Sequence, residues 1–419
     1  MKSNRILVWA FFAVALLIPD FASAYKWAEV KDMALIYQGG TQRPDWVEYQ
    51  LDPYVVHTYA DGRKEWFFDS YLFFEFRNGW SVSFAPGYDG VPSQKKDWEW
   101  LLNRLFEKER ALDALNNCIE RNKKILGEPG FKHKIVLGIP SAHPHQTNWG
   151  MLDGKALDFG NPEDRIAAEK WYIDQLMERF AAAEFNNIEL TGFYWIEEHD
   201  SHSSGILKDV SDYIHGKQKL FYWIPYWNAS GYNLWRRYGF DAAFLQPNHF
   251  FDPSIEDRRL EDACRAANKF NLGLEMEFDY RALHDEPYCQ ASRLESYIDY
   301  FEKFEVFEKS SIAYYSGTRA LLDMSLSSSV EDKMLLDRIA KHVSDRRAKW
   351  LGIEDIKNNG NKVTVIGGTG EIYISGNCET VEIWSAGGML ICREKERMAV
   401  APGIYIVRAD GVSTKVLVK

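Results

Sequence analysis

The segment Ile188-Glu-Leu-Thr-Gly-Phe-Tyr-Trp-Ile-Glu-Glu-His199 decides the fold predicted for this chain. Its apolar part is dense in β-branched and aromatic residues, which is typical of a strand buried on both faces of a parallel sheet. The preceding stretch, Pro162–Phe185, has helical spacing and follows Asn161, so a capping residue stands before a proline at the first helical position. A helix followed by such a strand indicates a repeating βα architecture.

The same alternation of short apolar runs and longer amphipathic segments extends along most of the chain. Eight strands are predicted, at Met33–Gln38, Tyr71–Phe76, Lys134–Ile139, Ile188–Ile196, Lys219–Ile224, Ala242–Leu245, Leu272–Phe278 and Ser311–Tyr315. The helices predicted between them include Asp97–Leu126, Pro162–Phe185, Glu256–Phe270 and Ala291–Phe307. This order predicts an α/β fold, the closed (β/α)₈ TIM barrel. An open doubly wound sheet is the alternative, although no glycine-rich phosphate loop follows the first strand.

The pattern changes near Gly352, where the apolar runs shorten, alternate with period two and are separated by glycine-rich turns. Strands predicted at Val363–Ile366, Val381–Trp384, Ile404–Val407 and Val416–Val418 indicate a small all-β sandwich. The ending from Ala401 onward resembles the C-terminal sorting domains of secreted proteins from Bacteroidetes. The predicted domains are therefore a signal peptide at 1–24, a catalytic barrel at 25–350 and a β-sandwich at 351–419.

The first residues predict export. Lys2 and Arg5 precede the apolar run Ile6–Ile18, and Ala22–Ala24 offers small residues around a cleavage site. This order is typical of a secretory signal peptide, with a retained anchor as the alternative. We therefore expect a protein that is secreted, periplasmic or on the cell surface. Later apolar runs are short and interrupted, so no integral membrane segment is expected after signal removal, and the protein is expected to be a monomer.

Charge and cysteine content exclude several classes of function. The formal net charge is −11, and lysines and arginines are scattered, so no basic stripe for nucleic acid is expected. The five cysteines form no C-x-x-C pair, which excludes zinc-ribbon and thioredoxin-like sites. They are Cys118, Cys264, Cys289, Cys378 and Cys392, of which the last two are candidates to face each other in the C-terminal sheet.

Acidic side chains stand at the ends of two predicted strands, where a parallel barrel has its active site. Glu197 and Glu198 end the fourth strand, and because successive side chains point to opposite faces, one of them faces the barrel mouth. In the seventh strand Glu275, Glu277 and Asp279 alternate with apolar residues, so all three share the face toward the barrel interior. Buried carboxylates are costly unless they are paired or used.

Two acids on different strand ends are what cleavage of a glycosidic bond requires: one protonates the leaving oxygen, and the other attacks the anomeric carbon or activates a water. The positions resemble the acid/base and nucleophile strands of the large clan of (β/α)₈ glycoside hydrolases (clan A). This resemblance implies Glu198, or Glu197, as the acid/base and Glu277, or Glu275, as its partner. The alternative is structural: Glu275 forms only an internal ion pair, for example with Arg281.

The segment Gly192–Glu198 also resembles a secreted barrel family known only as domain of unknown function 4855 (DUF4855). The Glu-x-Glu strand at Glu275 and Glu277 fits the same resemblance, which extends from Lys31 to about Lys349. It favours the second glutamate of the pair at the fourth strand, because that residue lies three positions after the tryptophan. The resemblance implies no particular substrate.

Other predicted strand ends supply side chains of the kind that bind sugars. Flat aromatic faces stack on sugar rings, while amides and imidazoles bind hydroxyl groups, so a polysaccharide or glycan is the expected substrate. No cofactor and no metal are expected in this interpretation. The expected substrate-binding residues are Gln38, His143, Trp195, Tyr226, Trp227, Asn228, Gln246, Asn248, His249, Asp279 and Tyr315.

Two other functions stay open. A catalytically silent barrel that binds glycans would keep the aromatic side chains but separate or salt-bridge the glutamates. A metal-dependent hydrolase could use His143, His145, His199 and His249 together with Asp200 or Asp279, and His202 also follows the fourth strand. The spacing of these histidines matches no strong metal motif. A serine nucleophile is not indicated, because no G-x-S-x-G elbow is present.

Overall fold

The computed structural model describes residues 28–79, 81–351, 354–358, 361–368, 370–376, 380–385, 390–393, 397–409 and 412–418. The predicted signal peptide and Cys378 lie outside these residues. Eight parallel strands close into a barrel, which confirms the predicted (β/α)₈ fold. In sequence order the barrel strands are β1 (Asp32–Tyr37), β4 (Ser70–Phe74), β7 (His133–Ile139), β10 (Ile188–Trp195), β11 (Leu220–Trp223), β12 (Ala242–Leu245), β13 (Gly273–Glu277) and β14 (Ile312–Tyr315).

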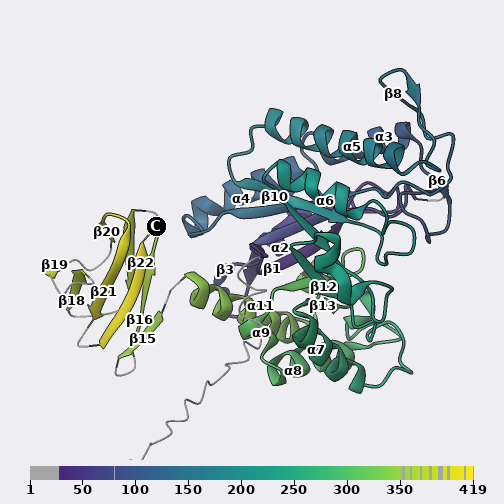
Figure 1. Ribbon diagram of the computed structural model, residues 1–419. Coiled ribbons are helices and arrows are strands. Elements are labelled where there is room, and N and C mark those ends of the chain that lie inside the picture. The colour runs from purple at the N-terminus through teal and green to yellow at the C-terminus, as the bar shows by residue number, and fades with distance from the viewer. Residues whose placement is uncertain are drawn as a thin grey trace, which may run out of the picture.

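The barrel closes because β1 pairs with both the second and the last strand of the cycle. Met33 is in register with Ser70 of β4 and with Ala313 of β14, so the strands follow sequence order around the barrel. Figure 1 shows helices around these strands, with α3 and α5 on one side and α7 and α8 on the opposite side. The helices are α2 (Glu48–Val55), α3 (Lys95–Leu105), α4 (Ala111–Leu126), α5 (Pro162–Ala182), α6 (Leu207–Gly216), α7 (Arg258–Phe270), α8 (Ala291–Lys303), α9 (Val306–Lys309), α10 (Ala320–Leu326), α11 (Val330–Leu351), and two 3₁₀ helices, η1 (Tyr232–Tyr238) and η2 (Tyr280–Ala282).

Two predicted helices are each divided in the structure. The segment predicted as Asp97–Leu126 is α3 and α4, separated by a turn in which Glu109 has a φ of 63° and its N–H binds Asp113. The N–H of Ala111 donates to Trp46 O at 2.9 Å. The turn between α3 and α4 is thereby joined to the loop after β1. The segment Ala291–Phe307 divides at Glu305, whose φ of 55° is incompatible with a continuous helix.

Short two-stranded sheets lie in the loops of the barrel. They are β2 (Val56–Thr58) with β3 (Lys64–Trp66), β5 (Val82–Ser83) with β6 (Val91–Pro92), and β8 (Met151–Leu152) with β9 (Lys155–Ala156). The β5–β6 piece follows β4, so its loop stands over the carboxyl end of the barrel strands.

Strand β10 carries an irregularity next to a very close strand contact. Its register with β7 shifts between Leu190 and Gly192. A Cβ atom at Gly192 would lie 2.1 Å from the carbonyl oxygen of Leu220 in β11, so only glycine fits between these strands.

The C-terminal part forms two small antiparallel sheets, as the sequence predicted. One sheet has the order β15 (Glu354–Asn358), β16 (Asn361–Gly367), β17 (Glu371–Gly376) and β20 (Arg397–Ala399); the other has the order β19 (Leu390–Cys392), β18 (Val381–Ser385), β21 (Gly403–Ala409) and β22 (Val412–Val418). Buried aliphatic residues of both sheets, among them Ile372, Ile383 and Val407, form one core. Figure 1 shows these sheets beyond the end of α11.

Within the described residues, no helix combines the length and the apolar character needed to cross a lipid bilayer.

Candidate active site

A cavity of about 160 Å³ opens at the carboxyl ends of the barrel strands. Several of its lining residues are the last of their strand: Tyr37 in β1, Phe74 in β4, Glu277 in β13 and Tyr315 in β14. This is the end at which parallel barrels carry their active sites. The lining residues are Leu35, Tyr37, Phe74, Phe76, Tyr88, Tyr194, Glu198, Ile224, Gln246, Asn248, Phe251, Glu275, Glu277 and Tyr315.

Aromatic rings form much of the wall of this cavity. Tyr37 packs against Phe74 with ring centroids 4.5 Å apart, and Tyr315 meets the Tyr37 ring edge-on at 5.8 Å. On another side, Phe76 and Tyr88 are stacked with centroids 4.2 Å apart. Rings that are held by other rings present fixed faces, and fixed apolar faces beside a few polar groups suit a small polar ligand such as a sugar.

Glu198 lines the cavity, whereas Glu197 does not. The Glu198 carboxylate accepts a hydrogen bond from Gln246 Nε2 at 2.6 Å on Oε1 and from the Tyr88 hydroxyl at 2.7 Å on Oε2. Gln246 Nε2 also donates to the carbonyl oxygen of Ile224 at 2.9 Å, which fixes the orientation of the amide. Burial raises the pKa of Glu198 above its usual range, and these two hydrogen bonds partly offset that rise.

Glu277 faces the same cavity from β13. Its Oε2 accepts hydrogen bonds from the backbone N–H of Asn248 and from the Tyr297 hydroxyl, both at 2.6 Å. Burial raises the pKa of Glu277 to about 7, although both donors favour the charged form and lower it. The charge of Glu198 adds to the rise. A carboxyl group with this pKa can give or take a proton near neutral pH, as general acid–base catalysis requires.

Glu275 is the third carboxyl group of the cavity. It precedes Glu277 by two residues on β13 and so lies deeper in the barrel. Burial raises its pKa well above the usual range, and the charges of Glu277 and Glu198 raise it further. Among the described residues its side chain has no hydrogen-bond partner and no ion pair. The ion pair considered with Arg281 does not form, because Arg281 binds Asp279 at 2.7 Å. Burial and the two acidic neighbours therefore favour the protonated form of Glu275.

The end of β12 connects the two hydrogen-bonded glutamates. The Gln246 side chain donates to Glu198, and the backbone N–H of Asn248, two residues later, donates to Glu277. The two carboxylates come from β10 and β13, which are separated around the barrel by β11 and β12. One short segment thus holds two acids that are far apart in the sequence.

Six of the residues predicted for the site line the cavity together: Glu198, Glu275, Glu277, Gln246, Asn248 and Tyr315. Tyr226 lies beside them, since it forms a parallel β-bridge with Gln246. Trp227 is half-buried, with the guanidinium of Arg259 over its ring at 5.2 Å, and Asn228 is exposed.

The remaining predicted residues point elsewhere. Gln38 donates to Arg104 O at 2.8 Å, and Asp279 caps η2 while it pairs with Arg281. Trp195 is fully buried and meets Phe221 edge-on. His249 is fully buried, with Nε2 at 2.8 Å from Asp257. His143 bonds Ser83 O at 3.2 Å, and burial lowers its pKa to about 4.

Sequence reasoning missed several residues that shape the cavity. Tyr88 comes from a loop rich in glycine and proline after β4, and Tyr297 comes from α8, where it has ordinary helical spacing. Tyr37, Phe76 and Tyr194 lie within predicted strands, where large aromatic side chains usually belong to the core. For Tyr194 the signal was its place near the end of β10, four residues before Glu198.

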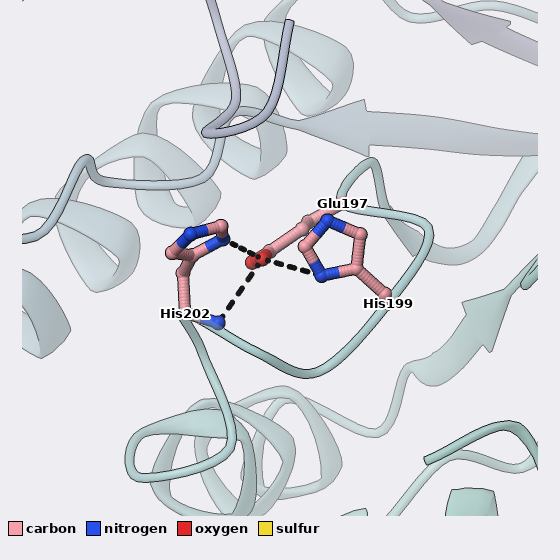
Figure 2. A group of neighbouring side chains, drawn as sticks. All are labelled: Glu197, His199 and His202. Atoms are coloured by element: carbon pink, nitrogen blue, oxygen red, sulfur yellow. Dashed lines mark hydrogen bonds and ion pairs between the residues drawn. The ribbon is translucent and has the colours of Figure 1, made fainter. Parts of the chain in front are cut away.

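The described histidines do not form the metal site that the sequence offered as an alternative. Among the described residues, no three of His143, His145, His199 and His249 come within metal-ligand distance of one another. Instead, Glu197, His199 and His202 lie together on the loop after β10, with potential ligand atoms all within 4.8 Å (Figure 2). None of these three residues lines the cavity.

Comparisons with known proteins identify a family but no activity. No curated protein sequence matches this chain. Among solved structures, an alpha-amylase from Malbranchea cinnamomea has 11% identity and a TM-score of 0.39, and covers 94% of this chain and 97% of its own. A mutant tryptophan synthase alpha-subunit from Pyrococcus furiosus has 9% identity and a TM-score of 0.34, with 75% and 98% covered. At such TM-scores the fold assignment depends on the strand order of this chain itself. The family model described as "Domain of unknown function (DUF4855)" matches residues 32–341, and the chain belongs to that family.

Proposed function

We propose that this protein is a secreted glycoside hydrolase that cleaves a polysaccharide or glycan with Glu198 and Glu277. One observation carries the proposal: two buried carboxyl groups from the ends of β10 and β13 share one aromatic-walled cavity at the carboxyl end of the barrel. Glycoside cleavage needs two such groups on opposite sides of the scissile bond. Secretion depends on the sequence of residues 1–24 alone.

Glu198 takes the role of acid/base. Gln246 Nε2 can only donate, so Oε1 of Glu198 is its unprotonated oxygen and the acid proton sits on Oε2. Oε2 is bonded to the Tyr88 hydroxyl, which can accept as well as donate. Tyr88 can therefore stay bonded to Glu198 in both protonation states. This suits an acid/base residue, which first donates a proton and later removes one.

Glu277 takes the role of nucleophile or of base toward a water. Two donors fix its Oε2 and stabilise the charged form, in which a carboxylate attacks or accepts a proton. Burial and the neighbouring charges raise the pKa of Glu275 below it, which favours the protonated form and limits the negative charge at the floor of the cavity. Glu197 faces away from the cavity, and the proposal therefore uses Glu198.

The proposal is tested on purified protein with aryl glycosides and a panel of polysaccharides. The wild type should release sugar, whereas Glu198→Gln and Glu277→Gln should lose turnover and still bind the substrate that the wild type cleaves. Glu295→Gln, at an exposed position of α8, is the matched control and should behave like the wild type. Azide should restore turnover to a Glu277→Gly variant if Glu277 is the nucleophile of a retaining enzyme.

Two results would contradict the proposal. Binding of glycans without release of sugar by the wild type would support the catalytically silent alternative. Equal turnover by the wild type and both glutamine variants would show that the reaction uses other residues.

A further inference from the structure

A separate cluster of polar side chains occupies the loop that leaves β10. Figure 2 shows Glu197, His199 and His202 turned toward one another, with the two imidazole rings on either side of one carboxylate. His202 Nδ1 lies 2.8 Å from Glu197 Oε1, and His199 Nδ1 lies 3.4 Å from the same oxygen. These residues form a Glu-x-His-x-x-His sequence that the proposed hydrolysis does not use.

One separation in the cluster matches a tetrahedral metal ion, and the 2.8 Å between His202 Nδ1 and Glu197 Oε1 would have to lengthen. Zinc binds imidazole nitrogen and carboxylate oxygen at about 2.0–2.2 Å, so neighbouring ligand atoms on a tetrahedron are about 3.3–3.5 Å apart. The pair of His199 Nδ1 and Glu197 Oε1 already has this separation. All three ligand atoms lie within 4.8 Å of one another, so small side-chain rotations would complete the site.

A hydrogen bond holds the His199 ring in an orientation that suits a metal ligand. The backbone N–H of Ser201 donates to His199 Nδ1 at 3.3 Å, so this nitrogen acts as an acceptor toward Ser201. The same nitrogen lies 3.4 Å from Glu197 Oε1. A transition-metal ion between them can use both atoms as ligands.

Burial supports the same conclusion. Glu197 is fully buried, and its other oxygen accepts a hydrogen bond from Ser141 at 3.3 Å. The side chains of His199 and His202 are 19% and 39% exposed, so an ion can enter from solvent while the carboxylate anchors it from below. Two imidazoles and one carboxylate are ligands that suit zinc, with a fourth position left for water.

We propose that Glu197, His199 and His202 bind one Zn²⁺ ion, which fixes the turn that carries Glu198. The ion would tie the end of β10 to the following loop and thereby restrict the backbone on both sides of Glu198. The site does not depend on the proposed hydrolysis, since none of its residues lines the cavity. It also departs from the sequence interpretation, in which no metal was expected.

Zinc binding is tested by calorimetric titration of the chelator-treated full chain with Zn²⁺, with Mg²⁺ as the comparison ion. The wild type should bind one Zn²⁺ per chain. His199→Ala and His202→Ala should each weaken binding by at least about 100-fold, since loss of mere supporting partners of metal ligands costs 10- to 100-fold. The control is His215→Asn, a histidine at the far end of α6 that pairs with Asp241 before β12, and it should bind like the wild type.

A second measurement uses only the wild type, so it does not depend on whether the variants fold. X-ray absorption of the zinc-loaded wild type should show only nitrogen and oxygen ligands. Absence of stoichiometric zinc binding, sulfur ligands, or unchanged affinity in both folded alanine variants would overturn the proposal. These results are independent of glycan hydrolysis, because neither measurement involves a sugar.

Discussion

Replacing Glu277 by glutamine tests the electrostatics of the cavity without knowledge of the substrate. Burial raises the pKa of Glu277 from 4.5 to about 7, so between these values the folded chain keeps a proton that the unfolded chain has lost. The free energy of unfolding therefore falls as pH rises through this window, and the loss is complete above about pH 7. Below pH 4.5 both states hold the proton, and Glu277 carries no such penalty.

The magnitude follows from the same pKa. A rise from 4.5 to about 7, at about 1.36 kcal/mol for each pKa unit, corresponds to about 3 kcal/mol of stability lost at pH 8. Glutamine has the shape of the protonated acid, and its carbonyl oxygen can accept from Asn248 N and Tyr297 in place of Oε2. Glu277→Gln should thus be more stable than the wild type at pH 8, by up to about 3 kcal/mol.

The assay is urea unfolding followed by tryptophan fluorescence at pH 5 and pH 8. The gain from Glu277→Gln should be several times larger at pH 8 than at pH 5, and Glu295→Gln, on the exposed face of α8, should show no such dependence. If Glu277→Gln changes stability equally at both pH values, the pKa of this carboxyl group is not raised, and the reasoning is wrong.

Three further outcomes are expected. Glu198→Gln should reduce turnover about 10²- to 10⁴-fold, the usual contribution of a general acid, and unchanged kcat in a sugar-release assay would exclude Glu198. Tyr297→Phe should raise the pKa of Glu277 by about 1–2 units, since a hydrogen bond to a charged group contributes about 1.5–3 kcal/mol. A ¹³C NMR titration of the Glu277 carboxyl group measures this pKa, and an unshifted titration curve would contradict the prediction. Gly192→Ala should destabilise the fold by more than about 3 kcal/mol, because the new Cβ would lie 2.1 Å from Leu220 O; a wild-type melting temperature would show that β10 and β11 can separate at low cost.

The barrel could be predicted because each buried strand has a local signature. All eight predicted strands appear in the structure, and Ala242–Leu245 has the predicted bounds. The divided helices could not be predicted, because their breaks depend on tertiary contacts such as the bond from Ala111 N to Trp46 O. Helical spacing continues through Asp97–Leu126 although the backbone does not.

Alternation along strands predicted only part of the set of residues that line the cavity. Glu275 and Glu277 lie inside β13 and share the cavity, whereas Asp279 follows the end of the strand, where the alternation no longer applies. Glu197 and Glu198 also follow the end of their strand, since β10 ends at Trp195, so the alternation could not say which of the two faces the cavity. Residues brought by other elements, such as Tyr297 on α8, had no comparable signal.

Because the segment 246–248 donates to both Glu198 and Glu277, the hydrogen bonding of two acids depends on one short loop. A substitution in this loop therefore acts on both carboxyl groups at once, although neither strand that carries them is changed. The two acids of the cavity thus share a support that belongs to neither of their own strands.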